Sequence, residues 1–176
     1  MKKLVIAETV GLVFGLIAGT VLHFVYKWSG CNDIIALFAP INESVWEHLK
    51  LLFIPFILYA VVEYYIIGNK YTGFFTVKAF AVILGILSLL AMFYTYTAIA
   101  GRNFLFADII IFVISNVLMY IFGLSEIPNE NSSNKKGITI IFLITIMFFI
   151  FTVYPPQGSL FTDPLAKGNT CITLLL

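Results

Sequence analysis

Residues 43–50 bring two carboxylates, an imidazole and an ammonium together within eight positions. Ionised groups are costly in apolar surroundings, and most of this sequence is apolar, so the stretch needs a structural or a functional explanation. Glu43, Glu47 and Lys50 are spaced at i, i+4 and i+7, which places them on one face of a helix that begins by Glu43. His48 would project about 100° away on that helix.

A cleft that gathers these side chains with His23 and Asp108 would support three kinds of chemistry. Carboxylates and imidazoles can hold Zn²⁺ or another divalent metal. The same groups can act as general acid and base without a metal, or relay protons in a transporter. We predict Glu47 and His48 as catalytic groups, Glu47, His48 and His23 as metal ligands, and Glu43, Lys50, Asp108 and Arg102 as supporting residues, with Lys50 or Arg102 holding an anion.

The same stretch also has a structural interpretation. Ser44 and Glu47 match a capping box, in which both side chains satisfy free backbone donors at a helix start. Trp46 suits the aromatic belt at a membrane interface. This interpretation leaves His48 and Lys50 unexplained, although Lys50 could pair with Glu47 three residues earlier or extend back to the interface.

The elements that position these residues are apolar helices. The chain is 61% hydrophobic and 11% charged, whereas soluble domains carry about 25% charged residues. A membrane-spanning helix needs about 20 mostly apolar residues. The sequence therefore predicts an all-α fold, a polytopic membrane helix bundle that forms a single integral membrane domain over residues 1–176. Its five predicted spans are residues 4–26, 45–67, 75–96, 104–122 and 138–154.

Smaller signals within the spans predict how the helices pack. Gly11, Gly15 and Gly19 recur at i, i+4 and i+8, which is typical of a smooth face for close helix packing. Pro55 predicts a kink in its helix, because proline removes one intrahelical donor. The connector of residues 27–41 carries turn signals and an apolar piece too short to span, so we expect a turn or a short interfacial or re-entrant segment there.

The distribution of basic residues favours a cytoplasmic N-terminus and an extracytoplasmic C-terminus. The side that would be cytoplasmic holds six Lys residues near helix ends, against four Lys and Arg residues on the other side. An odd number of spans then places residues 43–50, His23, Arg102 and Asp108 on one extracytoplasmic face. The opposite face holds Glu8, which we expect to pair with a nearby lysine, and Glu63, with the plain lysine-bearing loops.

The remaining polar residues have structural explanations. Asp108 could cap its helix and pair with Arg102, Glu63 is expected to be an interfacial charge beside two tyrosines, and Asn116 is expected to hydrogen-bond between helices. Cys31 and Cys171 fall on the same side of the membrane, where they could form a disulfide.

The sequence also resembles a bacterial family known as domain of unknown function 6512, which consists of small multi-helix membrane proteins. The segments that carry the resemblance are HFVY at 23–26, WSG at 28–30, NESVWEHLKLLF at 42–53, FYTY at 93–96, YPP at 154–156 and LFTDP at 160–164, with Gly101 and Asp108. It spans nearly the full length and implies an integral membrane location, but no activity. The family pattern implies a His after the two prolines, where this chain has Gln157, and its usual ending is replaced by residues 166–176.

Three functions remain open at this point. The first is a small membrane enzyme or metal-binding protein that acts at the extracytoplasmic face on lipid-linked material, with a divalent metal as its cofactor. The second is a transporter or channel subunit, which would need an oligomer and a polar path towards Asn116, Glu63 and Glu8. The third is a structural or partner-binding membrane protein. The expected partners are the lipid bilayer and a second copy or another membrane protein, while a net charge of +1 argues against nucleic acid.

Overall fold

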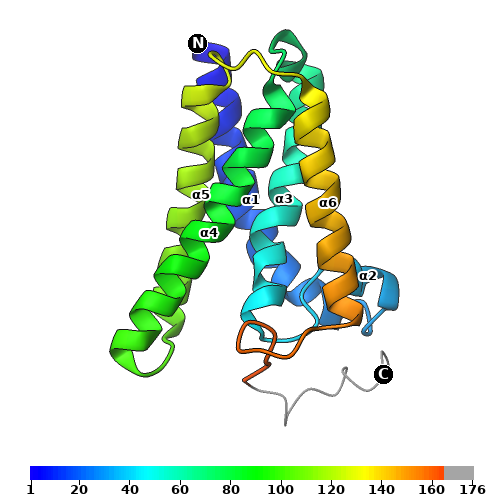
Figure 1. Ribbon diagram of the computed structural model, residues 1–176, viewed down its shortest axis with the longest axis vertical. Helices are drawn as coiled ribbons and strands as arrows, with labels where there is room; N and C mark the ends of the chain where they lie inside the picture. The colour runs from blue at the N-terminus through cyan, green and yellow to red at the C-terminus, as the bar shows by residue number, and fades with distance from the viewer. Residues whose placement is uncertain (165–176) are drawn as a thin grey trace.

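The structure is a computed structural model that describes residues 1–164, and all regular elements in this range are helices (Figure 1). In chain order they are α1 (Lys2–Trp28), α2 (Asp33–Phe38), α3 (Val45–Ile66), the short 3₁₀ helix η1 (Gly68–Lys70), α4 (Phe74–Ala100), α5 (Leu105–Glu126) and α6 (Asn134–Val153).

Five of the helices, α1, α3, α4, α5 and α6, are long and apolar enough to cross a membrane. This confirms the all-α class and the five predicted spans, and it identifies a multi-pass membrane protein. The helices extend beyond the apolar runs: α4 covers Phe74–Ala100, where the sequence predicted residues 75–96. At its C-terminal end α4 continues to Gly101, whose left-handed backbone ends the helix while its N–H donates to the Thr97 oxygen. Pro55 lies inside α3, and the predicted kink stays a prediction.

Two ends of the bundle can be distinguished in Figure 1. The N-terminus, η1 and the α5–α6 connection lie at one end, which we call the N-terminal end. The α1–α3 connector with α2, the α4–α5 turn and the end of α6 lie at the other, which we call the α2 end. The residues predicted to share one membrane face therefore do lie at the same end of the bundle. At the α2 end, the α4–α5 hairpin diverges from α3 and α6.

Close approach of α1 to its neighbours depends on the predicted glycine face. Gly11, Gly15 and Gly19 are all buried. A Cβ on Gly19 would lie 2.5 Å from the backbone oxygen of Leu51 in α3, and one on Gly11 would lie 2.4 Å from the Tyr59 ring. Helix α1 therefore packs against α3 at a distance that only glycine permits at these positions.

The connector between α1 and α3 folds into a short helix. Asn32 starts α2 by accepting hydrogen bonds from the backbone N–H groups of Ile34 and Ile35, at 2.9 and 3.3 Å. The six residues of α2 contact α6 and α1 at this end. This is the turn or short segment that the sequence predicted for residues 27–41.

Trp46 packs inside the protein and does not form the expected interfacial anchor. Only 6% of it is exposed, and its ring contacts those of Phe148, Phe151 and Phe161. The cause is that the segment after α6 folds back over the start of α3. There the backbone N–H of Trp46 donates to the backbone oxygen of Leu160 at 2.9 Å. Hydropathy alone does not reveal such a return of the chain.

Candidate functional site

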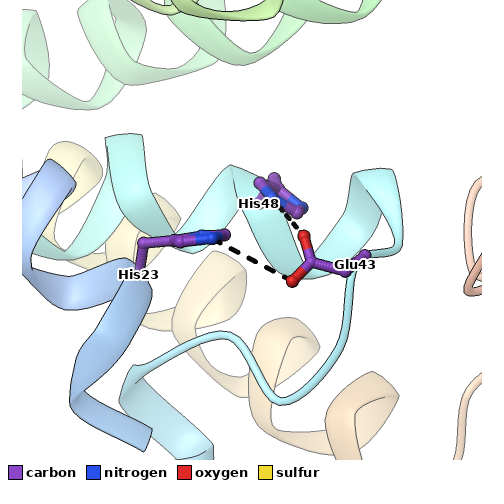
Figure 2. Close-up of side chains that lie close together, drawn as sticks. All are labelled: His23, Glu43 and His48. Atoms are coloured by element: carbon purple, nitrogen blue, oxygen red, sulfur yellow. Dashed lines mark ion pairs between the residues drawn. The ribbon is translucent and has the colours of Figure 1, made fainter. Parts of the chain in front are cut away.

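His23, Glu43 and His48 come from three parts of the chain and lie close together (Figure 2), at the α2 end of the bundle. His23 lies near the end of α1, Glu43 lies in the segment between α2 and α3, and His48 lies in the first turn of α3. Ser44 fixes that turn, because its side chain accepts a hydrogen bond from the Glu47 N–H at 3.3 Å. The hydrogen bond that the predicted capping box assigns to the Ser44 side chain is therefore present.

The Glu43 carboxylate lies between the two imidazole rings. Its Oε1 is 4.0 Å from His23 Nε2, and its Oε2 is 3.4 Å from His48 Nε2. One ligand atom from each residue can be chosen so that all three lie within 4.8 Å of one another. The three side chains are 25–32% exposed, so the group is partly covered but accessible. We call these three residues the His–Glu–His cluster.

The orientation of His48 is fixed by its other ring nitrogen. Nδ1 lies 2.9 Å from the Ser44 backbone oxygen. A carbonyl can only accept, so Nδ1 carries the hydrogen, and in the neutral ring Nε2 presents its lone pair to the Glu43 carboxylate. Two acceptors do not attract each other, so a second proton or a cation must lie between them. A histidine that donates its distal N–H to a carbonyl is the usual arrangement of a metal ligand.

The charges around Glu43 favour its ionised form. When His48 carries its second proton, its Nε2–H donates to the Glu43 carboxylate, and this hydrogen bond lowers the pKa of that carboxyl below its ordinary value, more than partial burial raises it. The nearby imidazoles and Lys27, whose Nζ is 4.0 Å from Oε1, act in the same direction. At neutral pH the cluster therefore contains a carboxylate, which is the form that coordinates metal ions.

Glu47 and Lys50 form a separate buried ion pair. Their side chains are 3% and 0% exposed, and Lys50 Nζ lies 2.7 Å from Glu47 Oε2. Lys50 also donates to the Ala36 oxygen at 2.9 Å, while Glu47 accepts from the Ile41 N–H at 3.0 Å and the Thr152 hydroxyl at 3.0 Å. The predicted pairing of Lys50 with Glu47 is confirmed. The predicted catalytic and metal-binding roles of Glu47 and the anion-binding role of Lys50 stay predictions.

Asp108 and Arg102 organise the α4–α5 turn. Asp108 accepts a short hydrogen bond from the Tyr96 hydroxyl, which itself accepts from the Phe104 N–H at 3.2 Å. The Arg102 guanidinium lies over the Phe104 ring, 4.6 Å from its centroid, rather than on Asp108. Asp108 acts on His48 only through longer-range electrostatic attraction. The structure therefore brings His23, Glu43 and His48 together but leaves Asp108 and Arg102 outside direct contact.

A second charged group lies towards the N-terminal end and was not predicted as a site. Lys78 contacts the carboxylates of both Glu8 and Glu63, and all three residues are buried. The predicted pairing of Glu8 with a lysine is confirmed, whereas the predicted interfacial position of Glu63 is wrong, because its side chain is buried against Lys78. Lys78 lies four residues inside α4, and a lysine within an apolar run is itself a signal of a buried charge pair.

Two sequence predictions remain to be compared with the structure: the hydrogen bond of Asn116 and the residues of the C-terminal tail. The Asn116 side chain donates to the Phe112 oxygen of its own helix at 2.9 Å, so this bond does not join two helices as expected. Gln157, which stands where the family pattern has His, is exposed. Cys171 and the altered ending at residues 166–176 lie outside the described residues, so the disulfide of Cys31 with Cys171 stays a prediction.

Comparison with known proteins gives a family but no activity. No curated protein and no solved structure matches the chain. The model of a family of unknown function, DUF6512, matches residues 1–171, a range that includes all five spans and the His–Glu–His cluster. The match covers almost the whole chain and agrees with the resemblance carried by the segments at 23–30 and 42–53. This multi-pass membrane protein therefore belongs to the family of unknown function DUF6512.

Proposed function

We propose that this protein is a membrane metalloprotein that binds a divalent transition metal through His23, Glu43 and His48 at its extracytoplasmic face. One observation carries the proposal: the Glu43 carboxylate lies between two imidazoles, and the hydrogen bond to Ser44 turns the free nitrogen of His48 towards it. A metal ion bound by all three residues would replace the repulsion between these acceptors with three coordinate bonds.

The chemistry of the donor set favours Zn²⁺ or a similar ion over Mg²⁺ or Ca²⁺. Two imidazole nitrogens and one carboxylate oxygen suit borderline metals, whereas Mg²⁺ and Ca²⁺ prefer sites made only of oxygen. Tetrahedral zinc with bonds of about 2.0–2.1 Å separates its ligand atoms by about 3.3 Å. The Glu43–His48 distance of 3.4 Å is already of this size, while His23 has to approach further.

Three protein ligands leave one tetrahedral position open, which is the arrangement of catalytic zinc sites. A water molecule in that position has its pKa lowered to about 7 and supplies a nucleophile at neutral pH. The cluster lies at the helix ends, where headgroups of lipids and lipid-linked molecules would be within reach. The activity that we propose is therefore metal-assisted hydrolysis at the membrane surface.

The transporter alternative requires Glu8 and Glu63 on a polar path that continues from the site. Their carboxylates instead face Lys78, and the two residues are 3% and 0% exposed. These contacts favour a local binding site over a path across the membrane. The structural alternative is an imidazolium ion pair between His48 and Glu43 that joins α3 to its preceding segment, and it predicts no metal binding.

The test is metal analysis and Zn²⁺ titration of the full chain purified in detergent. We expect one Zn²⁺ per wild-type chain and a loss of affinity of at least about tenfold in His23→Gln, Glu43→Gln and His48→Gln, because each variant removes a ligand. Glu126→Gln, which removes a carboxylate in the last turn of α5 at the N-terminal end, serves as the matched control, and it should bind like wild type. If the wild-type protein binds no metal, the metalloprotein proposal is wrong and the ion pair between His48 and Glu43 is the better explanation. Loss of binding in Glu47→Gln but not in Glu43→Gln would transfer the ligand role to Glu47.

A further inference from the structure

The buried group near the N-terminal end contains two carboxylates but one ammonium. Lys78 Nζ lies 2.8 and 3.0 Å from the two oxygens of Glu8 and 2.7 Å from Oε2 of Glu63. The exposed fractions of the lysine and Glu63 are 0%, and that of Glu8 is 3%. These residues come from α4, α1 and α3, so the group joins three spans. We call it the lysine–carboxylate cluster.

The surroundings of the cluster offer no second positive charge among the described residues. The faces of Phe56, Phe74 and Tyr120 surround Lys78, with ring centroids 5.2–5.4 Å from Nζ. The other titratable neighbours are Tyr59, whose hydroxyl donates to the Ala7 oxygen at 2.7 Å, and Tyr120. If both carboxyl groups were ionised, the cluster would keep one uncompensated negative charge in an apolar interior, which is strongly unfavourable.

Neither oxygen of the Glu63 carboxylate has a hydrogen-bond donor among the described residues, although Oε2 has the ion contact with Lys78 at 2.7 Å. Glu63 Oε1 is fully buried and accepts no hydrogen bond from the residues that the structure describes. The Glu8 and Glu63 carboxyl groups lie on the same ammonium, because both contact Lys78 Nζ at 2.7–3.0 Å. Two ionised carboxylates can only accept, whereas one protonated carboxyl group could donate to its neighbour on the same ammonium. A shared proton would satisfy the free oxygen and remove the excess charge together.

We infer that the lysine–carboxylate cluster is a proton-binding site that holds one proton between Glu8 and Glu63 at neutral pH. A pocket of about 280 Å³ opens at the N-terminal end, lined by Met1, Lys2, Lys3, Leu4, Ile67, Lys70 and Tyr71. Leu4 and Ile67 lie one helical turn from Glu8 and Glu63, so the cluster lies about one turn from this pocket, behind buried apolar side chains. Proton binding here is separate from the His–Glu–His cluster at the other end.

Infrared spectroscopy of the full chain in detergent tests the inference, because a protonated carboxyl group has a carbonyl stretch that a carboxylate lacks. We expect wild type at neutral pH to show this band, with the small shift in D₂O that marks an exchangeable proton. In Glu8→Gln and Glu63→Gln, one carboxylate faces one ammonium and needs no proton, so the band should disappear. Glu47→Gln is the matched control, since it removes a buried carboxylate that already has its own lysine, and it should keep the band.

Two results would overturn the inference. A wild-type spectrum without the band would mean that both carboxyl groups are ionised, whatever the folding of the variants. A band that persists in either Glu8→Gln or Glu63→Gln would mean that the proton belongs to another carboxyl group. Circular dichroism and size-exclusion chromatography of each variant confirm that the spectra come from folded protein.

Discussion

At the scale of the residue, Glu43 connects the stability of the site to pH. The pKa of its carboxyl is lower in the folded protein than its ordinary value of 4.5, chiefly because protonated His48 hydrogen-bonds to the carboxylate. The unfolded chain therefore binds more protons between the two pKa values. The stabilising contribution of Glu43 is fully present above the ordinary pKa, and it is lost as the pH falls through the lowered one.

Metal-free wild type should therefore be more stable than Glu43→Gln at neutral pH. The difference should shrink as the pH falls below the ordinary pKa of the carboxyl, because protonated Glu43 resembles glutamine. Thermal unfolding in detergent with a chelator, followed from neutral to acid pH, measures the difference. If the difference in thermal stability between the two proteins does not change at acid pH, the carboxylate does not stabilise the fold through its charge.

The residue types of the site could be predicted from the sequence, but the choice of carboxylate could not. Glu43 and Glu47 lie five residues and one residue before His48, and neither would share its helix face, so helical spacing does not choose between them. Which one meets the imidazoles depends on the connector, whose Ile41 N–H and Ala36 oxygen hold Glu47 and Lys50 away from the cluster. That path includes the non-helical backbone of residues 39–44, which has no periodicity from which its course could be read.

At the scale of the element, the Glu47–Lys50 pair fastens α2 and α6 to the start of α3. Lys50→Met should remove the positive partner and leave a buried carboxylate, for which the cost is typically about 3–5 kcal/mol. The double variant Lys50→Met with Glu47→Gln should recover part of that loss, because no charge remains buried. Denaturant unfolding of both variants in detergent measures the effect. A Lys50→Met variant as stable as wild type would show that the pair does not hold these elements.

The helices themselves were the most predictable elements, because twenty apolar residues in a row have few alternatives to a membrane span. The contacts between them were less predictable. Glycine spacing identified the face of α1 that meets α3, since the residues involved are local in sequence. Trp46 and Phe161 are over a hundred positions apart, and Lys78 meets Glu8 across 70 positions, so these contacts required the three-dimensional arrangement.

At the scale of the whole molecule, the two charged groups lie at opposite ends of the bundle and differ in accessibility. The His–Glu–His cluster is partly exposed, whereas the lysine–carboxylate cluster is enclosed by three spans. Each proposal therefore depends on which compartment its end of the bundle faces. A site for metal-assisted hydrolysis at the α2 end would meet extracytoplasmic substrates only if the N-terminus is cytoplasmic.

We predict this orientation from the excess of lysines near the helix ends at the N-terminal side. Cysteines introduced by Arg102→Cys, in the α4–α5 turn, and Asn131→Cys, in the α5–α6 connection, should separate the two faces. A membrane-impermeant thiol reagent applied to intact cells should label the Arg102→Cys protein, and it should label the Asn131→Cys protein only after the membrane is opened, with the unsubstituted chain as background. The reverse pattern would place the His–Glu–His cluster on the cytoplasmic face. Only α5 lies between the two positions, so they must be on opposite faces if α5 crosses the membrane. Labelling of both variants from outside would therefore contradict the five-span arrangement.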